Sequence, residues 1–215
     1  PDMILLPGSK NTMEDLKWMR QNGLEAAIKK HAQNRDAVIF GICGGYQMLG
    51  ECITDPYGVE EGGMLRGMEL LPMETEMEQE KTRTQVDGTF EELTGVLSVL
   101  SGVKLTGYEI HMGQSIYETQ PCRLVELTDT RTQEANTDGY ASDRVYGSYV
   151  HGIFDRHEIV ESILGALARE KGIETVAEHI LDYRAYKETQ YDRLAEELRN
   201  AIDMPRIYEI MDKGV

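Results

Sequence analysis

The chain has 215 residues, of which 40% are hydrophobic, so it can bury one sizeable core and is not an intrinsically disordered protein. Its formal net charge of −16 argues against nucleic acid or an anionic membrane surface as partner, because both would repel it. Cys43, Cys52 and Cys122 lack zinc-like spacing and cannot all pair, which is typical of the reducing cytoplasm. No apolar run reaches membrane-spanning length. We therefore expect a cytoplasmic globular protein without a metal site.

The first predicted unit is a strand, a turn and a helix. Met3–Leu6 is an apolar strand pattern, and the turn runs from Pro7 to Thr12. Thr12 is predicted to be the helix N-cap, with Asp15 in the place of the acidic residue of a capping box. Apolar residues at helical spacing predict one helix reaching about Lys30. These apolar residues are Met13, Leu16, Met19, Leu24, Ala27 and Ile28.

The next unit places a single cysteine between glycines. The apolar run Ala37–Phe40 predicts a buried strand, and a helical pattern begins just after Cys43. A strand, a tight turn and a helix form a nucleophile elbow, in which Gly41 and Gly45 let the chain reverse. Gly44 leaves space beside the sulfur, and its N–H is well placed to stabilise an oxyanion. Amide groups at the start of the helix should also favour the thiolate. A free cysteine is usually an inert core residue, but flanking glycines favour a reactive one.

These two units place their turns together. A strand–turn–helix unit that leads directly into a second strand predicts parallel neighbouring strands. The carboxyl ends of both strands, marked by Gly8 and Cys43, then lie at one edge of the sheet, where open α/β sheets bind ligands. Gly8 is therefore a candidate second donor to an oxyanion, although a glycine after a proline is more often only a turn.

The middle of the chain carries weaker signals. Residues 51–67 are rich in glycine and acidic residues and predict a loop, whereas 68–77 alternate enough for a strand. Further short strands are expected within 86–120, and residues 129–142 are predicted to be a loop or hairpin tip. The other assignments are a polar connection at 78–85 and β-like runs at 96–100, 107–113 and 123–127.

A second chemical landmark follows at residues 145–155. A β-prone run ends at His151, and Asp155 then fits an N-cap with Glu158 at the third helical position. The helix that follows is predicted to end at Gly172. In a parallel sheet, a histidine at a strand end lies at the edge already assigned to Cys43. Cysteine and histidine together form a nucleophile and its general base.

The motifs resemble those of a known family. The run Gly41–Gly50 resembles the nucleophile motif of class I (triad) glutamine amidotransferases, and more narrowly that of the glutaminase domains of cobyric acid synthases. Four other stretches of the chain are similar to that family in the same order. They are Leu6–Thr12, Gly107–Gly113, Gly147–Asp155 and the closing helical run from Tyr186 through Leu198 to Tyr208.

The resemblance implies a fold and an activity. The fold would be α/β, a flavodoxin-like sandwich with a mostly parallel central sheet. Such glutaminases hydrolyse glutamine through a cysteine thioester and pass ammonia to a synthetase domain. That domain uses ATP and Mg²⁺ to amidate carboxylates of adenosylcobyrinic acid a,c-diamide in cobalamin biosynthesis. The glutaminase domain itself is expected to need no cofactor.

The resemblance also assigns roles to residues. By motif position, Cys43 is the nucleophile, His151 is the base, and Gly8 and Gly44 are the oxyanion donors. Four further residues are candidates for the glutamine pocket, and a purely structural role is an equal alternative for each of them. These are Gln47, Tyr108, Glu109 and His111.

The chain departs from the wider class of triad amidotransferases at two points. Most triad amidotransferases carry a glutamate two residues after the histidine, where this chain has Ile153, although cobyric acid synthases tend to lack it. Asp155 is the nearest acid, but its capping pattern explains it equally well. No phosphate-binding loop is present, so residues 1–215 are interpreted as a glutaminase domain without its N-terminal synthetase domain. The family's usual first β-α unit is also missing before Pro1, and the exposed sheet edge would let two copies pair.

Two alternatives remain at this point. One is the glutaminase of a related amidotransferase, such as cobyrinic acid a,c-diamide synthase or the bacterial enzyme that amidates lipid II. The run Tyr108–Gly113 favours cobyric acid synthase over these. The other is a non-catalytic domain that keeps the fold for docking.

Overall fold

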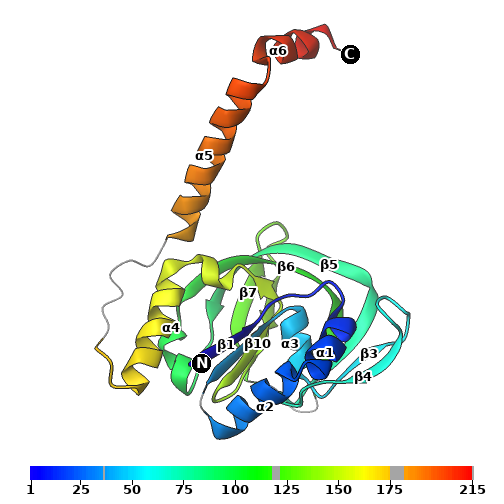
Figure 1. Cartoon of the computed structure of the whole chain (residues 1–215), viewed down its shortest axis with the longest axis vertical. Helices are drawn as coiled ribbons and strands as arrows, with labels where there is room; N and C mark the ends of the chain where they lie inside the picture. The colour runs from blue at the N-terminus through cyan, green and yellow to red at the C-terminus, as the bar shows by residue number, and fades with distance from the viewer. Residues whose placement is uncertain (36, 118–121, 175–181, 215) are drawn as a thin grey trace.

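The computed structural model describes residues 1–35, 37–117, 122–174 and 182–214, and it has the expected α/β architecture (Figure 1). Two sheets organise the chain, one with four strands and one with seven. The four-stranded sheet has the order β1-β2-β10-β9. Its strands are β1 (Met3–Leu6), β2 (Val38–Ile42), β10 (Val145–Ser148) and β9 (Tyr140–Ala141).

The smaller sheet is mostly parallel. β1 and β10 both pair with β2 in parallel, and only β9 runs antiparallel. Leu6 lies opposite Gly41, and Ser148 lies opposite Ile42. The three parallel strands therefore end at the same edge, which confirms the predicted pairing of the first two strands. The turns that follow β1 and β2 contain Gly8 and Cys43. His151 was predicted at the end of a parallel strand; it instead lies in β11 (Val150–His151), which begins one residue after β10 and belongs to the other sheet.

Helices cover both faces of this sheet, and β2 is therefore buried on both sides. Val38, Phe40 and Ile42 belong to one core cluster, which includes apolar side chains of α4. Ile39 faces the opposite way and packs with α1, α2 and α3. Figure 1 shows α4 on one side of β1 and β10, with α1 and α3 on the other. The bounds are α1 Thr12–Gln21, α2 Leu24–Asn34, α3 Gly44–Leu49 and α4 His157–Glu170.

The larger sheet is mainly antiparallel and is built on a long ribbon of β5 and β6. The chain reaches it directly from β10, because β11 follows after one residue and pairs with β6. This pairing puts His151 opposite Tyr108. The strands are β3 Cys52–Asp55, β4 Gly63–Arg66, β5 Glu74–Phe90, β6 Lys104–Ile116, β7 Val125–Asp129, β8 Ala135–Asp138 and β11 Val150–His151.

The first helical region differs from the prediction in two ways. The predicted single helix is two helices, because Gly23 has φ 76° and breaks the chain between α1 and α2. The N-cap is Asn11 rather than Thr12, and the Asn11 side chain accepts from Glu14 N at 3.1 Å. The Thr12 hydroxyl is directed inward, and the Asp15 carboxylate accepts from the Ser9 hydroxyl.

The predictions for residues 51–85 were partly wrong. The expected loop at 51–67 contains β3 and β4, which pair as a hairpin. Residues 68–73 are not a strand, and the backbone of Met68 and Leu70 instead satisfies carbonyl groups at the end of α3. The predicted polar connection at 78–85 lies inside β5. Its sequence is polar because this part of the β5–β6 ribbon is exposed to solvent. The register of β5 against β6 also shifts between Met77 and Thr82.

Three later assignments also change. Residues 96–100 form a 3-10 helix, η1 (Val96–Leu100), in which Leu97 and Leu100 are buried one turn apart. The predicted loop or hairpin tip at 129–142 holds the turn of the β7–β8 hairpin, but it also contains β8 and β9. The strand expected at 123–127 is shifted to β7. Asp155 is not an N-cap: it ends the 3-10 helix η2 (Ile153–Asp155), and Arg156 precedes α4 without a side-chain cap. Positions 118–120 of the predicted β-rich region lie outside the described residues.

The C-terminal region consists of α5 (Tyr183–Ala201) and α6 (Met204–Lys213), which extend away from the two sheets (Figure 1). Neither helix buries a residue among those whose side chains are described. Large apolar side chains on both are exposed, including Leu194, Leu198 and Met211. Over the described ranges, no helix combines the length and apolarity needed to cross a membrane.

Candidate active site

Cys43 stands at the predicted elbow between β2 and α3. Its backbone has φ 52° and ψ −111°, a strained conformation for a residue with a side chain. The glycines permit the close packing behind it. A Cβ atom on Gly45 would lie 2.2 Å from the Leu6 carbonyl oxygen, and one on Gly41 would lie 2.7 Å from the Gly45 backbone. The residue types at 41 and 45 therefore follow from backbone contact.

Gly8 brings the predicted nucleophile and base into one place. A Cβ atom built on Gly8 would lie 3.6 Å from Cys43 Cβ and 2.9 Å from Cε1 of the His151 imidazole. Both side chains therefore approach the same point beside the turn after β1. The sequence prediction that these three residues share one edge of the sheet is confirmed.

Cys43 is only 6% exposed, and its thiol donates to the Ile110 carbonyl oxygen at 3.5 Å. Burial raises its pKa, and the backbone N–H of Gly44 opposes that shift. The predicted stabilisation of the thiolate by the helix start is thus present, but it is smaller than the cost of desolvation. A thiolate at this position requires a group that removes the proton during reaction.

His151 is suited to accept that proton. Burial, followed by the nearby His111, lowers the pKa of its imidazole, so the ring is neutral at pH 7. Its Nε2 atom is buried and has no hydrogen-bond partner among the described residues. The Tyr108 ring stacks on the imidazole with centroids 5.0 Å apart and an interplanar angle of 5°. Stacking fixes the plane of the base without consuming its ring nitrogens.

Gly44 begins α3 directly after the thiol. A Cβ atom at this position would lie 2.8 Å from the Ser9 backbone nitrogen, so α3 packs closely on the turn that contains Gly8. The first amides of a helix have no partner within the helix and can face a ligand. The two predicted oxyanion donors therefore lie close together beside Cys43, Gly44 at the start of α3 and Gly8 in the neighbouring turn.

Gln47 is held inside the protein. It is 2% exposed, its Oε1 accepts from the Thr12 hydroxyl at 3.1 Å, and its side chain also bonds to Tyr149. A Cβ atom on Gly113 would lie 2.4 Å from Gln47 Nε2, so β6 passes close to this amide. These contacts describe a group that joins α1, α3 and β6, rather than one that faces an open pocket.

The other three predicted pocket residues lie on β6, which crosses the elbow. Tyr108 is 44% exposed above His151, whereas Glu109 is 8% exposed. Burial, with smaller effects of Asp138 and Asp129, raises the pKa of Glu109 to about 7. His111 stacks on Tyr149 at 3.9 Å between ring centroids, and its Nε2 lies 3.9 Å from Glu109 Oε1. Burial lowers the pKa of His111.

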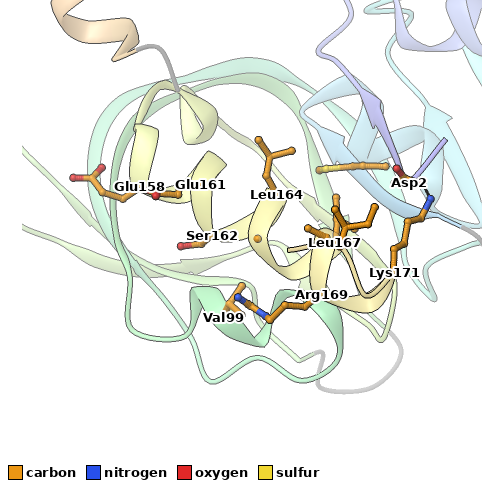
Figure 2. A pocket seen from close by; sticks show the side chains of 13 residues that line it. Asp2, Val99, Glu158, Glu161, Ser162, Leu164, Leu167, Arg169 and Lys171 are labelled. Carbon is orange, nitrogen blue, oxygen red and sulfur yellow. Dashed lines mark hydrogen bonds and ion pairs between the residues drawn. The ribbon is translucent and has the colours of Figure 1, made fainter. Parts of the chain in front are cut away.

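Hollows in the surface lie beside these residues. Tyr108 and Glu109 line a pocket of about 390 Å³ together with Arg83 and Arg131, and Gly8 belongs to an apolar groove of about 340 Å³. A groove of about 860 Å³ beside α4, shown in Figure 2, contains none of the predicted site residues. Within the described ranges, no three histidine, cysteine or acidic side chains are grouped as metal ligands would be.

Two residues beside the elbow were not predicted from the sequence. Ser148 is fully buried, and its carbonyl accepts the Cys43 N–H at 2.8 Å. Asp138 is 6% exposed and accepts the Ser148 hydroxyl at 2.5 Å. Asp138 lies within a polar stretch predicted to be a loop or hairpin tip. Nothing in the local sequence pattern indicates that Asp138 is buried.

The family follows from comparison with known proteins. Residues 1–159 match the CobB/CobQ-like glutamine amidotransferase domain. This match covers most of the chain and includes Cys43 and His151. The chain therefore belongs to the CobB/CobQ-like family of glutamine amidotransferases, which are enzymes.

Similar curated proteins narrow the comparison. The whole chain is 49% identical to a cobyric acid synthase of Lachnoclostridium phytofermentans, of which it covers 43%. It is 50% identical to a cobyric acid synthase of Ruminiclostridium cellulolyticum, of which it covers 42%. The chain thus spans less than half the length of these relatives and corresponds to their C-terminal glutaminase part.

A solved structure shares the fold at low sequence identity. The structure of PurLQS from Thermotoga maritima superposes with a TM-score of 0.53 and 18% identity. The match covers 77% of this chain and 80% of the other. At this identity the likeness extends to the fold alone.

Proposed function

We propose that residues 1–215 are the glutaminase domain of a cobyric acid synthase, and that Cys43 and His151 carry its chemistry. The observation that supports this most strongly is the convergence of both side chains on Gly8, beside the carboxyl ends of β1 and β2. About half of the residues along the whole chain are identical to those of two cobyric acid synthases.

In the first half-reaction, the Cys43 sulfur attacks the side-chain carboxamide carbon of glutamine while the His151 imidazole takes the thiol proton. The carbonyl oxygen becomes an oxyanion, which accepts hydrogen bonds from the backbone N–H groups of Gly8 and Gly44. His151 then gives the proton to the leaving nitrogen. The C–N bond breaks, ammonia leaves, and a γ-glutamyl thioester remains on Cys43.

In the second half-reaction, His151 takes a proton from water, whose oxygen attacks the thioester carbon. The C–S bond breaks, and the proton returns to the Cys43 sulfur. Glutamate is released with the enzyme restored. The lowered pKa of His151 suits both steps, since only the neutral imidazole accepts a proton.

The ammonia would pass to a synthetase half that lies outside this chain. That half would use ATP and Mg²⁺ to amidate carboxylates of adenosylcobyrinic acid a,c-diamide. The relatives named cobyric acid synthase are more than twice as long as the chain, which leaves room for such a half. The location that we propose is the cytoplasm, in keeping with three cysteines that are all free.

The experiment compares glutamate release by the chain and by its Cys43→Ala variant, alone and with the synthetase half. We expect the substitution to lower kcat by several orders of magnitude. Cys122→Ala is the matched control, because Cys122 is an exposed free thiol outside the elbow. Glutamate release by Cys43→Ala at the wild-type rate would refute the proposal.

The acceptor separates cobyric acid synthase from its sister enzymes. With wild-type protein, glutamine-dependent ATP consumption is measured on the a,c-diamide and on cobyrinic acid, which is the less amidated acceptor. Turnover on the a,c-diamide supports the proposal. Turnover on cobyrinic acid alone assigns the chain to the sister class.

A further inference from the structure

Asp138 is a buried carboxylate at the end of β8 that the proposed reaction does not use. Its Oδ2 accepts the Ser148 hydroxyl at 2.5 Å and the Tyr149 backbone N–H at 2.8 Å. The Gly139 backbone N–H is a further donor to the same carboxylate. Removing a carboxylate from water is costly, and each of these bonds offsets part of that cost. The structure therefore holds the group in place from several sides.

The segment that Asp138 holds connects the two candidate catalytic residues. The Ser148 carbonyl accepts the Cys43 N–H at 2.8 Å, so one end of the segment bonds directly to the elbow. The Ser148 hydroxyl also accepts the Val150 N–H at 3.0 Å, and His151 is the next residue. A continuous set of hydrogen bonds thus reaches both Cys43 and the backbone beside His151 from one carboxylate.

This segment makes an unusual crossing. It leaves the parallel sheet at Ser148 and enters the antiparallel sheet at Val150, so Tyr149 belongs to neither strand. The backbone N–H of Tyr149 needs an acceptor outside both ladders, and Asp138 supplies it. Cys43 is itself held at positive φ, which persists only where neighbouring groups fix it.

We propose that Asp138, acting through Ser148, is a positioning residue that sets the relative placement of Cys43 and His151. This inference rests on the proposed glutaminase function. The negative charge of Asp138 disfavours a thiolate at Cys43, so its benefit to catalysis is geometric rather than electrostatic. A misplacement of about 1 Å between reacting groups can lower a rate by about 100-fold.

The test uses two substitutions, Asp138→Asn and Ser148→Ala, in the chain assayed with its synthetase half. Asparagine keeps the shape but removes the charge and one acceptor oxygen. Alanine removes the hydroxyl and leaves the Ser148 backbone carbonyl in place. A diazoketone analogue of glutamine alkylates the active-site thiol, and labelling is carried to its end point so that folded but slowly reacting sites are also counted. The kcat value is expressed per labelled site. We expect kcat per site to fall by about 10- to 100-fold, with KM nearly unchanged.

Asp55→Asn is the matched control. Asp55 is also a buried carboxylate that accepts three backbone N–H groups, from Val59, Glu60 and Gly62, at 2.8–2.9 Å. Its loss should reduce the number of labelled sites on heating but leave kcat per site at the wild-type value. A role for Asp138 in folding alone would give the same result as this control.

Wild-type kcat per site in both Asp138→Asn and Ser148→Ala would overturn the positioning role, provided that Cys43→Ala is inactive. The proposed function would then stand without it. Full activity in Cys43→Ala, or no glutamate release by the wild type with its synthetase half, would overturn the proposed function and this inference with it.

Discussion

The two sheets of the molecule contribute differently to the candidate site. The parallel sheet supplies the turns with Gly8 and Cys43, on strands that are buried between helices. The antiparallel sheet supplies β6, whose Ile110 carbonyl meets the thiol and whose Tyr108 stacks on His151. His151 stands where the chain passes from one sheet to the other.

This difference indicates a division of tasks. All five residues of β2 are buried, so the elbow is fixed by packing from both faces. The β5–β6 ribbon is exposed over much of its length and contacts the site only near its middle. We therefore expect substitutions at the junction and the parallel edge to affect turnover strongly, and substitutions on β6 to modify it.

The largest effect is expected at the junction. His151→Asn should lower kcat by about 10²- to 10⁴-fold, the range that a general acid–base supplies. His157→Asn at the start of α4 is the control, because that partly exposed histidine lies outside the site. Steady-state glutamate release measures both. If kcat of His151→Asn fell by less than 10-fold, His151 would not be the general acid and base of the reaction.

A smaller effect, on stability, is expected from β6. The pKa of Glu109 is about 7 in the folded protein, against 4.5 for an unperturbed glutamate, so folding takes up a proton between these values. Wild-type stability should therefore fall as pH rises from about 4.5 to 7. Glu109→Gln, which stays neutral, should be more stable at pH 8 by up to about 3 kcal/mol, and nearly equal at pH 4.

Denaturant unfolding at both pH values tests this expectation. Asp129 and Asp138 act on Glu109 in the same direction, and His111 lies 3.9 Å away. If the wild type were instead the more stable protein at pH 8, Glu109 would be ionised beside a protonated His111. The β6 strand would then carry charge at the site.

A comparable effect, on rate, is expected at the parallel edge. A methyl group in Gly8→Ala would lie 2.9 Å from the His151 ring and displace it, so we expect kcat to fall by about 100-fold. Gly165→Ala in α4 is the control, since its nearest neighbour would lie at 3.5 Å. Alanine there should stabilise the helix by about 1 kcal/mol without changing kcat. Equal kcat values for the two variants would contradict the geometry at Gly8.

The smallest effect is expected from the exposed ring on β6. Tyr108→Leu removes the stack on His151, which is worth about 0.5–1.5 kcal/mol, so kcat should fall by about 2- to 10-fold. Tyr108→Phe keeps the ring and should remain near the wild type. Glutamate release under saturating glutamine compares them. A 1,000-fold loss of kcat in Tyr108→Leu would contradict this difference, because a substitution on β6 would then affect turnover as strongly as one at His151.

The same contrast explains how much the sequence could predict. The parallel strands are short apolar runs buried on both faces, and the glycines around Cys43 are dictated by backbone contacts. The elbow, the pairing of β1 with β2 and the proximity of Cys43 to His151 could therefore be predicted from the sequence. The position of Gly8 followed from the same topology.

The antiparallel sheet was harder to predict from the sequence, for physical reasons. Residues 78–85 of β5 are polar because the ribbon is exposed, and the strands β3 and β4 are only four residues long among glycines. Burial of Asp138 depends on donors from residues 10 and 11 positions later in the chain. Such contacts leave no periodic trace in the sequence.

The central claim is that Cys43 forms a thioester with glutamine, and mass spectrometry tests it most directly. Wild-type protein is mixed with glutamine and its synthetase half, quenched in acid within one turnover, and digested. The proposed function predicts a mass gain of one γ-glutamyl group on the peptide that contains Cys43, and none on those containing Cys52 or Cys122. Glutamate release without an adduct on Cys43, or with the adduct on another cysteine, would contradict it.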